Sequence, residues 1–343
     1  MLACRIYGEK DIRVEDVPQP APGPGEVLLK LGAGGVCGSD LHYFQHGRVG
    51  NFIIREPLIP GHEASATVAA IGKDVTRVKP GDQVALSPSH ACGRCEACRT
   101  GRENLCRQMF FLGSASVFPH AQGLFREYFV LGERQCYPVA RDVSLAELAF
   151  AEPLAVALHA VNRAGNLLGA SVLVTGAGPI GSLIVMAARL GGATHVACSD
   201  VLDRPLAVAR QVGADEAIRV DRTPQAVAER RFDVALEASG NPGALRNCLA
   251  AVKRGGTVVQ VGTQPHEPAP FPLNEVMVHE LDLRGVFRWG REFDWAVRCL
   301  EARRLDVRPL LTGKFPLKDA PAAFAAAADK SQHMKVQLVA EEQ

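Results

Sequence analysis

Residues 172–181 read Val-Leu-Val-Thr-Gly-Ala-Gly-Pro-Ile-Gly, and this stretch decides the fold. A short apolar run suited to a buried strand leads into the spacing G-x-G-x-x-G, and residues 183–190 continue as an apolar helical segment. A strand, a glycine-rich turn and a helix in this order form the unit that binds the pyrophosphate of a dinucleotide. The stretch therefore predicts a nucleotide-binding α/β unit.

Each glycine of the turn is required for a different physical reason. Gly176 permits the tight reversal, Gly178 lets the backbone approach a pyrophosphate, and Gly181 allows the helix to pack closely on the strand. The helix N-terminus, with its free N–H groups and positive dipole end, attracts the phosphates. We expect the cofactor to contact Gly176, Gly178, Pro179, Ile180 and Gly181.

Asp200 stands at the end of the second predicted strand, 24 residues after Gly176. A carboxylate there accepts hydrogen bonds from the adenosine ribose hydroxyls and repels a 2′-phosphate, so the sequence predicts NAD. Arg204 lies close behind, and an arginine in that place can accommodate a phosphate, which keeps NADP as an alternative. The alternative interpretation is that Asp200 is only an acidic residue in a turn and does not contact a cofactor.

Around this unit, apolar strands alternate with helical stretches, which indicates a doubly wound parallel sheet. The predicted strands are Val172–Thr175, Val196–Cys198, Ala217–Val220, Phe232–Glu237, Thr257–Val261 and Leu281–Val286. We expect helices over residues 292–303 and 321–328, and a closing strand over residues 335–339.

The first 150 residues look different, because short β-branched runs alternate with turns rich in Gly and Pro. That pattern is typical of a β-rich domain with long loops. We therefore predict an α/β protein in which residues 1–153 and 287–343 form a β-rich catalytic domain and residues 154–286 form the dinucleotide-binding domain.

Composition narrows the function. Lys and Arg total 38 against 37 for Asp and Glu, and no charged run favours nucleic acid or anionic lipid as a partner. The N-terminus lacks a signal-peptide pattern, and no stretch of 18 apolar residues occurs, so we expect a soluble cytoplasmic protein without a membrane partner.

Four of the ten cysteines fall within fifteen residues, as Cys92, Cys95, Cys98 and Cys106. Thiolates at this spacing can surround one tetrahedral zinc, and a closed shell of four sulfurs leaves no open position for a substrate. The segment therefore predicts a structural zinc site. The alternatives are four unrelated thiols or disulfides, and a reducing cytoplasm disfavours disulfides.

A second set of candidate ligands is dispersed along the chain: Cys37, His62, Glu63 and Glu152. One thiolate, one imidazole and one or two carboxylates suit a catalytic zinc with an open coordination position. Taken alone, each residue has an ordinary reading as a core thiol, a turn histidine or a helix-start acid. Spacing does not show that they converge.

These motifs together resemble the zinc-dependent medium-chain alcohol dehydrogenases from end to end. They are residues 37–42 (Cys-Gly-Ser-Asp-Leu-His), residues 61–63 (Gly-His-Glu), the four-cysteine segment and residues 176–181, in that family's order. The resemblance implies a GroES-like catalytic domain, a Rossmann domain, and two zinc ions per chain, one catalytic and one structural. Dimers and tetramers are usual in this family, which implies a homodimer or homotetramer here.

The resemblance also assigns roles. It implies that Cys37 and His62 bind the catalytic zinc, that Glu63 is the third ligand, and that Glu152 acts directly or through a water; the sequence does not choose between the carboxylates. Ser39 and His42 would pass the substrate's proton towards the cofactor ribose and solvent. Glu152 stands where ordinary members of the family carry a cysteine, which points to the polyol branch.

Within that branch the chain resembles the L-idonate dehydrogenases through residues 34–45, 113–120 and 283–288. This resemblance implies a small-molecule substrate that is a sugar acid, with Phe118, His120 and Arg288 as candidate contacts. Arg288 is favoured for a carboxylate, because a guanidinium binds it bidentately. Sorbitol- or xylitol-type polyol oxidation is the alternative.

Two other classes remain as rivals. A non-catalytic dinucleotide-binding protein with structural zinc alone would lack the dispersed ligands, and a zinc-free quinone reductase would lack both cysteine groups. The dispersed ligands are all present, which favours the zinc dehydrogenase; they are Cys37, His62, Glu63 and Glu152.

Overall fold

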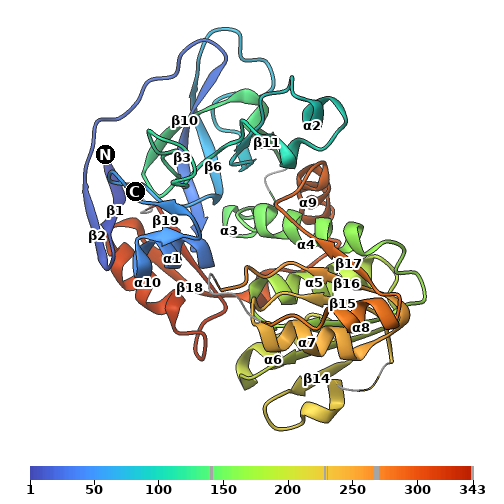
Figure 1. The fold of residues 1–343 in the computed structure, drawn as a ribbon. Coiled ribbons are helices and arrows are strands. Elements are labelled where there is room, and N and C mark those ends of the chain that lie inside the picture. Colours follow the sequence, from blue (N-terminus) through green and yellow to red (C-terminus); the bar gives the residue numbers. More distant parts are fainter. Residues whose placement is uncertain (140–141, 228, 230, 266–269, 341–343) are drawn as a thin grey trace.

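The computed structural model describes residues 1–139, 142–227, 229, 231–265 and 270–340. Figure 1 shows two sheet-based parts, with helices α4 (Ala151–Ala164) and α9 (Glu292–Glu301) lying between them. These helices contain many buried Ala, Leu, Val and Phe side chains, and they belong to one continuous apolar core with the strands of the second sheet.

The first part is built on a sheet in the order β11-β7-β6-β3-β19-β18, with β10 also paired to β3. Its strands are β3 (Glu26–Gly35), β6 (Glu63–Ile71), β7 (Gln83–Leu86), β10 (Tyr128–Gly132), β11 (Cys136–Pro138), β18 (Leu311–Pro316) and β19 (Lys335–Val339). The chain's last strand, β19, runs antiparallel to β3. Residues far apart in sequence therefore meet at the centre of this sheet.

The second part is a six-stranded, wholly parallel sheet in the order β14-β13-β12-β15-β16-β17. Its strands are β12 (Ser171–Thr175), β13 (His195–Asp200), β14 (Glu216–Arg219), β15 (Phe232–Glu237), β16 (Val252–Gln260) and β17 (Asp282–Gly285). The order reverses at β12, as in a Rossmann sheet. The predicted fold class is confirmed, although β14, β16 and β17 each end one residue earlier than expected.

The remaining elements connect and cover these sheets. They are β1 (Leu2–Gly8), β2 (Asp11–Asp16), α1 (Gly38–His46), β4 (Arg48–Val49), β5 (Phe52–Ile53), β8 (Ser89–His90), α2 (Glu96–Arg99), β9 (Phe110–Phe111), α3 (Leu145–Leu148), α5 (Pro179–Leu190), α6 (Asp203–Gln211), α7 (Pro242–Ala251), α8 (Leu273–Val278) and α10 (Ala320–Ala328). Helix α9 ends at Glu301, two residues short of the expected end. The domain boundaries after residues 153 and 286 stay predictions.

One stretch of the described chain, Leu145–Ala164, is long and apolar enough to span a membrane by length and composition. Of its most apolar window, 67% is buried inside the protein. The stretch contains α3 and α4, and the contacts of α4 with α5 and α9 account for its apolar character as part of the core.

Candidate active site and metal centres

The glycine-rich turn joins β12 to α5 at the point where the strand order reverses. Gly176 has a φ of 88°, in the left-handed region that favours glycine. At Gly181 a Cβ atom would collide with the carbonyl oxygen of Gly176, so only glycine allows this approach of helix to turn. Gly178 is the N-cap of α5 and Pro179 its first residue, which leaves the helix N-terminus open to an anion.

Asp200 lies at the end of β13, beside this turn. Its Oδ2 accepts the N–H of Ala177 at 2.7 Å, and its Oδ1 accepts the N–H groups of Val201 at 2.7 Å and Leu202 at 3.0 Å. These donors fix the carboxylate beside the glycine-rich turn. Arg204 is exposed on the first turn of α6.

Three of the four dispersed candidates converge. One ligand atom each of Cys37, His62 and Glu63 lies within 4.8 Å of the others. Cys37 caps α1 just after β3, and Glu63 opens β6 opposite Gly35, so the pairing of β3 with β6 creates the cluster. Sulfur, nitrogen and oxygen donors this close together match the ligand set of a zinc ion with an open position.

Asp40 stands behind His62. Its side chain is fully buried, and Oδ1 lies 3.7 Å from Nδ1 of His62. The same carboxylate accepts the N–H groups of Cys37 at 2.9 Å and Gly61 at 3.1 Å, so it ties both ligand segments together. A carboxylate behind a metal-binding histidine orients the imidazole ring.

Glu63 has a cation of its own. The ammonium of Lys335, on β19, donates to Oε2 of Glu63 at 2.6 Å and to Oε1 at 2.8 Å. It also donates to the carbonyl oxygen of Val36 at 3.2 Å. Both charged side chains are almost completely buried. Burial alone would lower the pKa of Lys335, but the neighbouring Glu63, Cys37 and Glu152 raise it instead.

Glu152 is the second residue of α4 and is buried beside this cluster. It is not within the 4.8 Å group, although the charges of His62, Glu63 and Cys37 all act on it. Burial raises the pKa of Glu152 well above its ordinary value. Burial likewise raises the pKa of Cys37 to about 12, whereas a bound metal requires the thiolate.

The two relay candidates lie on α1. Ser39, in the first turn, contacts the thiol of Cys37 through its side chain. His42 is one turn further on and exposed, and partial burial of its ring lowers its pKa. Ser39 is half-buried and His42 is exposed, so the two candidates lie at different depths on the same helix.

Arg288 lies over the aromatic ring of Phe111, with its guanidinium carbon 4.2 Å from the ring centroid. The same ring is 5.5 Å from that of His62, so Phe111 neighbours both the cluster and Arg288. Burial lowers the pKa of Arg288 to about 10, partly offset by the charge of Glu152. Among the residues that the structure describes, none forms an ion pair with Arg288.

The other two substrate candidates differ from each other. Phe118 is 59% exposed, with the guanidinium of Arg55 4.7 Å above its ring. His120 is buried, its Nε2 accepts the N–H of Arg55 at 2.9 Å, and its Nδ1 lies 2.9 Å from the carbonyl oxygen of Val117. Both ring nitrogens of His120 are engaged by the backbone, so this conformation presents no free donor to a substrate.

The four-cysteine segment forms a compact lobe between β8 and β9. The Sγ atoms of four cysteines all lie within 4.8 Å of one another: Cys92, Cys95, Cys98 and Cys106. Backbone N–H groups of Arg94 and Cys95 are the main cause that lowers the pKa of Cys92 to about 6. Four sulfur atoms that surround one point, with backbone N–H groups donating to them, fit a structural zinc ion.

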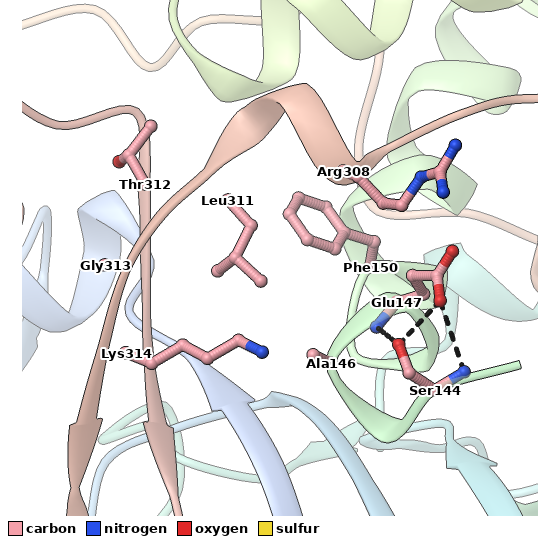
Figure 2. A pocket seen from close by; sticks show the side chains of 9 residues that line it. All are labelled: Ser144, Ala146, Glu147, Phe150, Arg308, Leu311, Thr312, Gly313 and Lys314. Carbon is pink, nitrogen blue, oxygen red and sulfur yellow. Dashed lines mark hydrogen bonds between the residues drawn. The ribbon is translucent and has the colours of Figure 1, made fainter.

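A cavity of about 490 Å³ lies apart from these sites, between α3 and β18 (Figure 2). Its lining is Ser144, Ala146, Glu147, Phe150, Arg308, Leu311, Thr312, Gly313 and Lys314. Within it, Ser144 and Glu147 are hydrogen-bonded to each other as the cap of α3. None of the lining residues belongs to the metal clusters or to the nucleotide turn.

Sequence reasoning missed three residues of this region: Asp40, Phe111 and Lys335. Asp40 carried a signal, because it follows Cys37 by three residues in a helix-capping pattern. Phe111 and Lys335 carried none, since their partners lie in distant segments.

Comparison with known proteins agrees with this geometry. Residues 23–141 match the family model of the alcohol dehydrogenase GroES-like domain, and residues 179–302 match that of the zinc-binding dehydrogenase. The chain is 40% identical over 340 residues to an L-idonate 5-dehydrogenase (NAD(P)(+)) of Escherichia coli, covering 98% of each chain.

Other relatives give the same result. A sorbitol dehydrogenase of Gallus gallus is 39% identical over 331 residues, covering 94% of this chain and 92% of that one. The crystal structure of L-idonate 5-dehydrogenase from Escherichia coli superposes with a TM-score of 0.93 at 40% identity, over 98% of this chain and 97% of that one. The chain therefore belongs to the zinc-dependent medium-chain alcohol dehydrogenase family, within its polyol branch.

Proposed function

We propose that this protein oxidises a secondary hydroxyl group of a sugar acid, L-idonate to 5-ketogluconate first of all, and transfers the hydride to NAD(P). The observation that carries the proposal is the environment of the Arg288 side chain. Its guanidinium is largely buried near Glu152 and the Cys37 cluster, and no described residue forms an ion pair with it. A buried cation of this kind favours a ligand with a carboxylate.

Cys37, His62 and Glu63 are the proposed ligands of the catalytic zinc. When bound there, zinc supplies a Lewis acid that lowers the pKa of the substrate's hydroxyl group. Asp40 holds the ring of His62, and Lys335 holds the carboxylate of Glu63. The clustering of Glu63 with Cys37 and His62 supports Glu63 as the third ligand, and leaves Glu152 to act beside it.

Ser39 and His42 are the proposed route for the proton released from that hydroxyl group. Ser39 is next to Cys37 and accepts the proton at its hydroxyl oxygen while releasing its own. His42, exposed on the same helix, delivers it to solvent. Ser39 would hand its proton on towards His42 in the presence of the bound cofactor, in line with the resemblance to the family.

The turn at residues 176–181 and Asp200 are proposed to hold the cofactor, with NAD preferred and NADP tolerated through Arg204. The carboxylate of Asp200 supports this, because it is already fixed beside the turn by three backbone donors. The E. coli relative that carries both cofactors in its name supports the tolerance of NADP.

Polyol oxidation is the second candidate, and the similarity to sorbitol dehydrogenases supports it. In that case Arg288 would donate hydrogen bonds to hydroxyl groups instead of binding a carboxylate. His120 has no free ring nitrogen for this role, so we propose that it shapes the substrate loop.

We also propose a homo-oligomer formed through β17. This strand is the edge of its sheet, and Leu283 on it is 44% exposed. Leu273, Met277 and Val278 of the neighbouring α8 are each more than half exposed. Sedimentation of Leu283→Asp should show smaller particles than the wild type.

A cytoplasmic location is proposed from the cysteines. All ten are free thiols in the structure, and a reducing compartment keeps thiols in that state.

Steady-state kinetics with L-idonate and sorbitol test the substrate. We expect kcat/KM to be higher for L-idonate, and Arg288→Gln to lower it by roughly thirty- to a hundredfold for the acid, as for a lost charged contact. Sorbitol should lose much less. Arg291→Gln, an exposed arginine of the same segment, is the matched control. A wild type that prefers sorbitol would contradict the sugar-acid proposal.

A further inference from the structure

A buried carboxylate outside the metal and nucleotide sites has no role in the chemistry described above. Glu292 is the first residue of α9 and is only 2% exposed. Its Oε1 accepts the side-chain N–H of Asn162 at 2.8 Å and lies 3.1 Å from Nδ1 of His159, both on α4. Its Oε2 accepts the backbone N–H of Gly290 at 2.7 Å.

These contacts keep the carboxylate ionised. Burial alone raises the pKa of Glu292, but the donors of His159, Asn162 and Gly290 outweigh it and lower the pKa to about 2. A charge of this cost is tolerated inside a protein only when its hydrogen bonds are complete. Three donors therefore contact this one carboxylate, and one of them is the backbone N–H of Gly290, two residues after Arg288.

The segment around Arg288 is held at both ends. Asn104, in the four-cysteine lobe, donates its amide N–H to the carbonyl oxygen of Phe287 at 2.9 Å, and Glu292 accepts from Gly290. Between them the side chain of Trp289 is buried, with its ring 6.0 Å from that of Phe111.

Arg288 itself has a φ of 55°, which costs free energy for a residue other than glycine. Such a conformation persists only where neighbouring contacts enforce it. The hydrogen bonds of Asn104 to Phe287 and of Gly290 to Glu292 are the flanking contacts here. Asn104 and Glu292 line the same cavity of about 340 Å³, together with His159 and Asn162.

We propose that Glu292 is a positioning residue for substrate selection: it fixes Gly290 against α4 and so holds Arg288 in the conformation that receives the substrate's carboxylate. This inference rests on the proposed function. Helix α4 starts with Ala151 and Glu152 and carries His159 and Asn162 further along, so one helix serves both the metal cluster and the Arg288 segment. One helix thereby connects Glu152, beside the Cys37 cluster, with the two side chains that contact Glu292.

The main variant is Glu292→Gln. Glutamine keeps the size, but it has one acceptor oxygen and an NH₂ group that faces donors, so at least one of the contacts to Gly290, Asn162 and His159 is lost. We expect KM for L-idonate to rise about tenfold, as for one lost charged hydrogen bond. The kcat for L-idonate and the kcat/KM for sorbitol should change less than twofold.

Two further variants serve as a control and as an independent test of the same role. Asp294→Asn, on the exposed side of the same helix turn, removes a surface pair with Arg298 and should leave all constants unchanged. Asn162→Ala removes one of the two donors from α4 and should raise KM for L-idonate in the same direction but less. It tests the same role if Glu292→Gln does not fold.

A double-mutant cycle separates positioning from general stability. In an Arg288→Gln background, Glu292→Gln should have no further effect on KM for L-idonate, because the group it positions is gone. Equal losses for L-idonate and sorbitol, or additive effects in the cycle, would overturn the positioning role. If Arg288→Gln alone leaves the ratio of acid to polyol unchanged, the proposed substrate fails, and the role of Glu292 fails with it.

Discussion

The ammonium nitrogen of Lys335 lies 2.6 Å from Oε2 of Glu63, and the two side chains are 5% and 1% exposed. This ion pair joins the first residue of β19 to the first residue of β6 across 272 positions of sequence. It places a cation next to a carboxylate that also belongs to the Cys37 cluster. The charge of Glu63 is therefore balanced before any metal is bound.

Replacing Lys335 with Met should destabilise the protein strongly when zinc is removed, because the carboxylate of Glu63 is left buried without its partner. Breaking a buried pair in this way costs about 3 to 5 kcal/mol. Bound zinc should recover part of this loss, since it can balance the same carboxylate. The check is the thermal midpoint of Lys335→Met with zinc and with chelator. Lys314→Met, an exposed lysine on the paired strand β18, should behave as the wild type.

The two metal clusters should respond differently to substitution. Cys37→Ser or His62→Ala should lower kcat by roughly a thousandfold or more while the protein still folds and binds NAD. Cys98→Ser should instead lower the thermal midpoint first, by roughly 5 °C or more, since it opens a closed shell. Metal analysis should give about two zinc ions per wild-type chain. A fully stable but inactive Cys98→Ser would exchange the two assignments.

Asp200→Ala should weaken NAD binding roughly tenfold and reduce discrimination against NADP, because it removes both an acceptor for the ribose and a repelling charge. Asp200→Asn is the matched variant, since its single side-chain oxygen can still accept the N–H of Ala177, while the charge and the acceptor for Val201 and Leu202 are lost. It should relax discrimination with less loss of NAD binding. Titration of NAD and NADP by quenching of protein fluorescence measures both. Unchanged binding of both cofactors in both variants would remove Asp200 from the site.

The sequence predicted the features that are local in the chain. Gly176, Gly181 and Asp200 follow from a strand, a turn and the next strand, whose spacing is fixed by backbone geometry. The cysteines of the lobe are equally local.

The convergence of Cys37 with Glu63 could not be predicted in this way, because it depends on the register that sets Gly35 opposite Glu63. No periodicity encodes that register. Lys335 was missed for the same reason, since a lysine at the start of a strand is ordinarily solvated and its partner is 272 positions away.

Acid should narrow the stability gap between the wild type and Glu292→Gln. The pKa of Glu292 is lowered to about 2 in the folded protein from an ordinary value of 4.5. A carboxylate with a lowered pKa contributes its stabilisation above its unfolded pKa and loses it as the pH falls towards the folded one. Glu292 therefore contributes up to about 3 kcal/mol at pH 7, and this contribution declines below about pH 4.5. Thermal midpoints of both proteins between pH 7 and pH 3 should converge as the pH falls, whereas Asp294→Asn should follow the wild type throughout. A gap that stays constant or widens in acid would show that Glu292 does not fold as the ionised group that holds Gly290 in place.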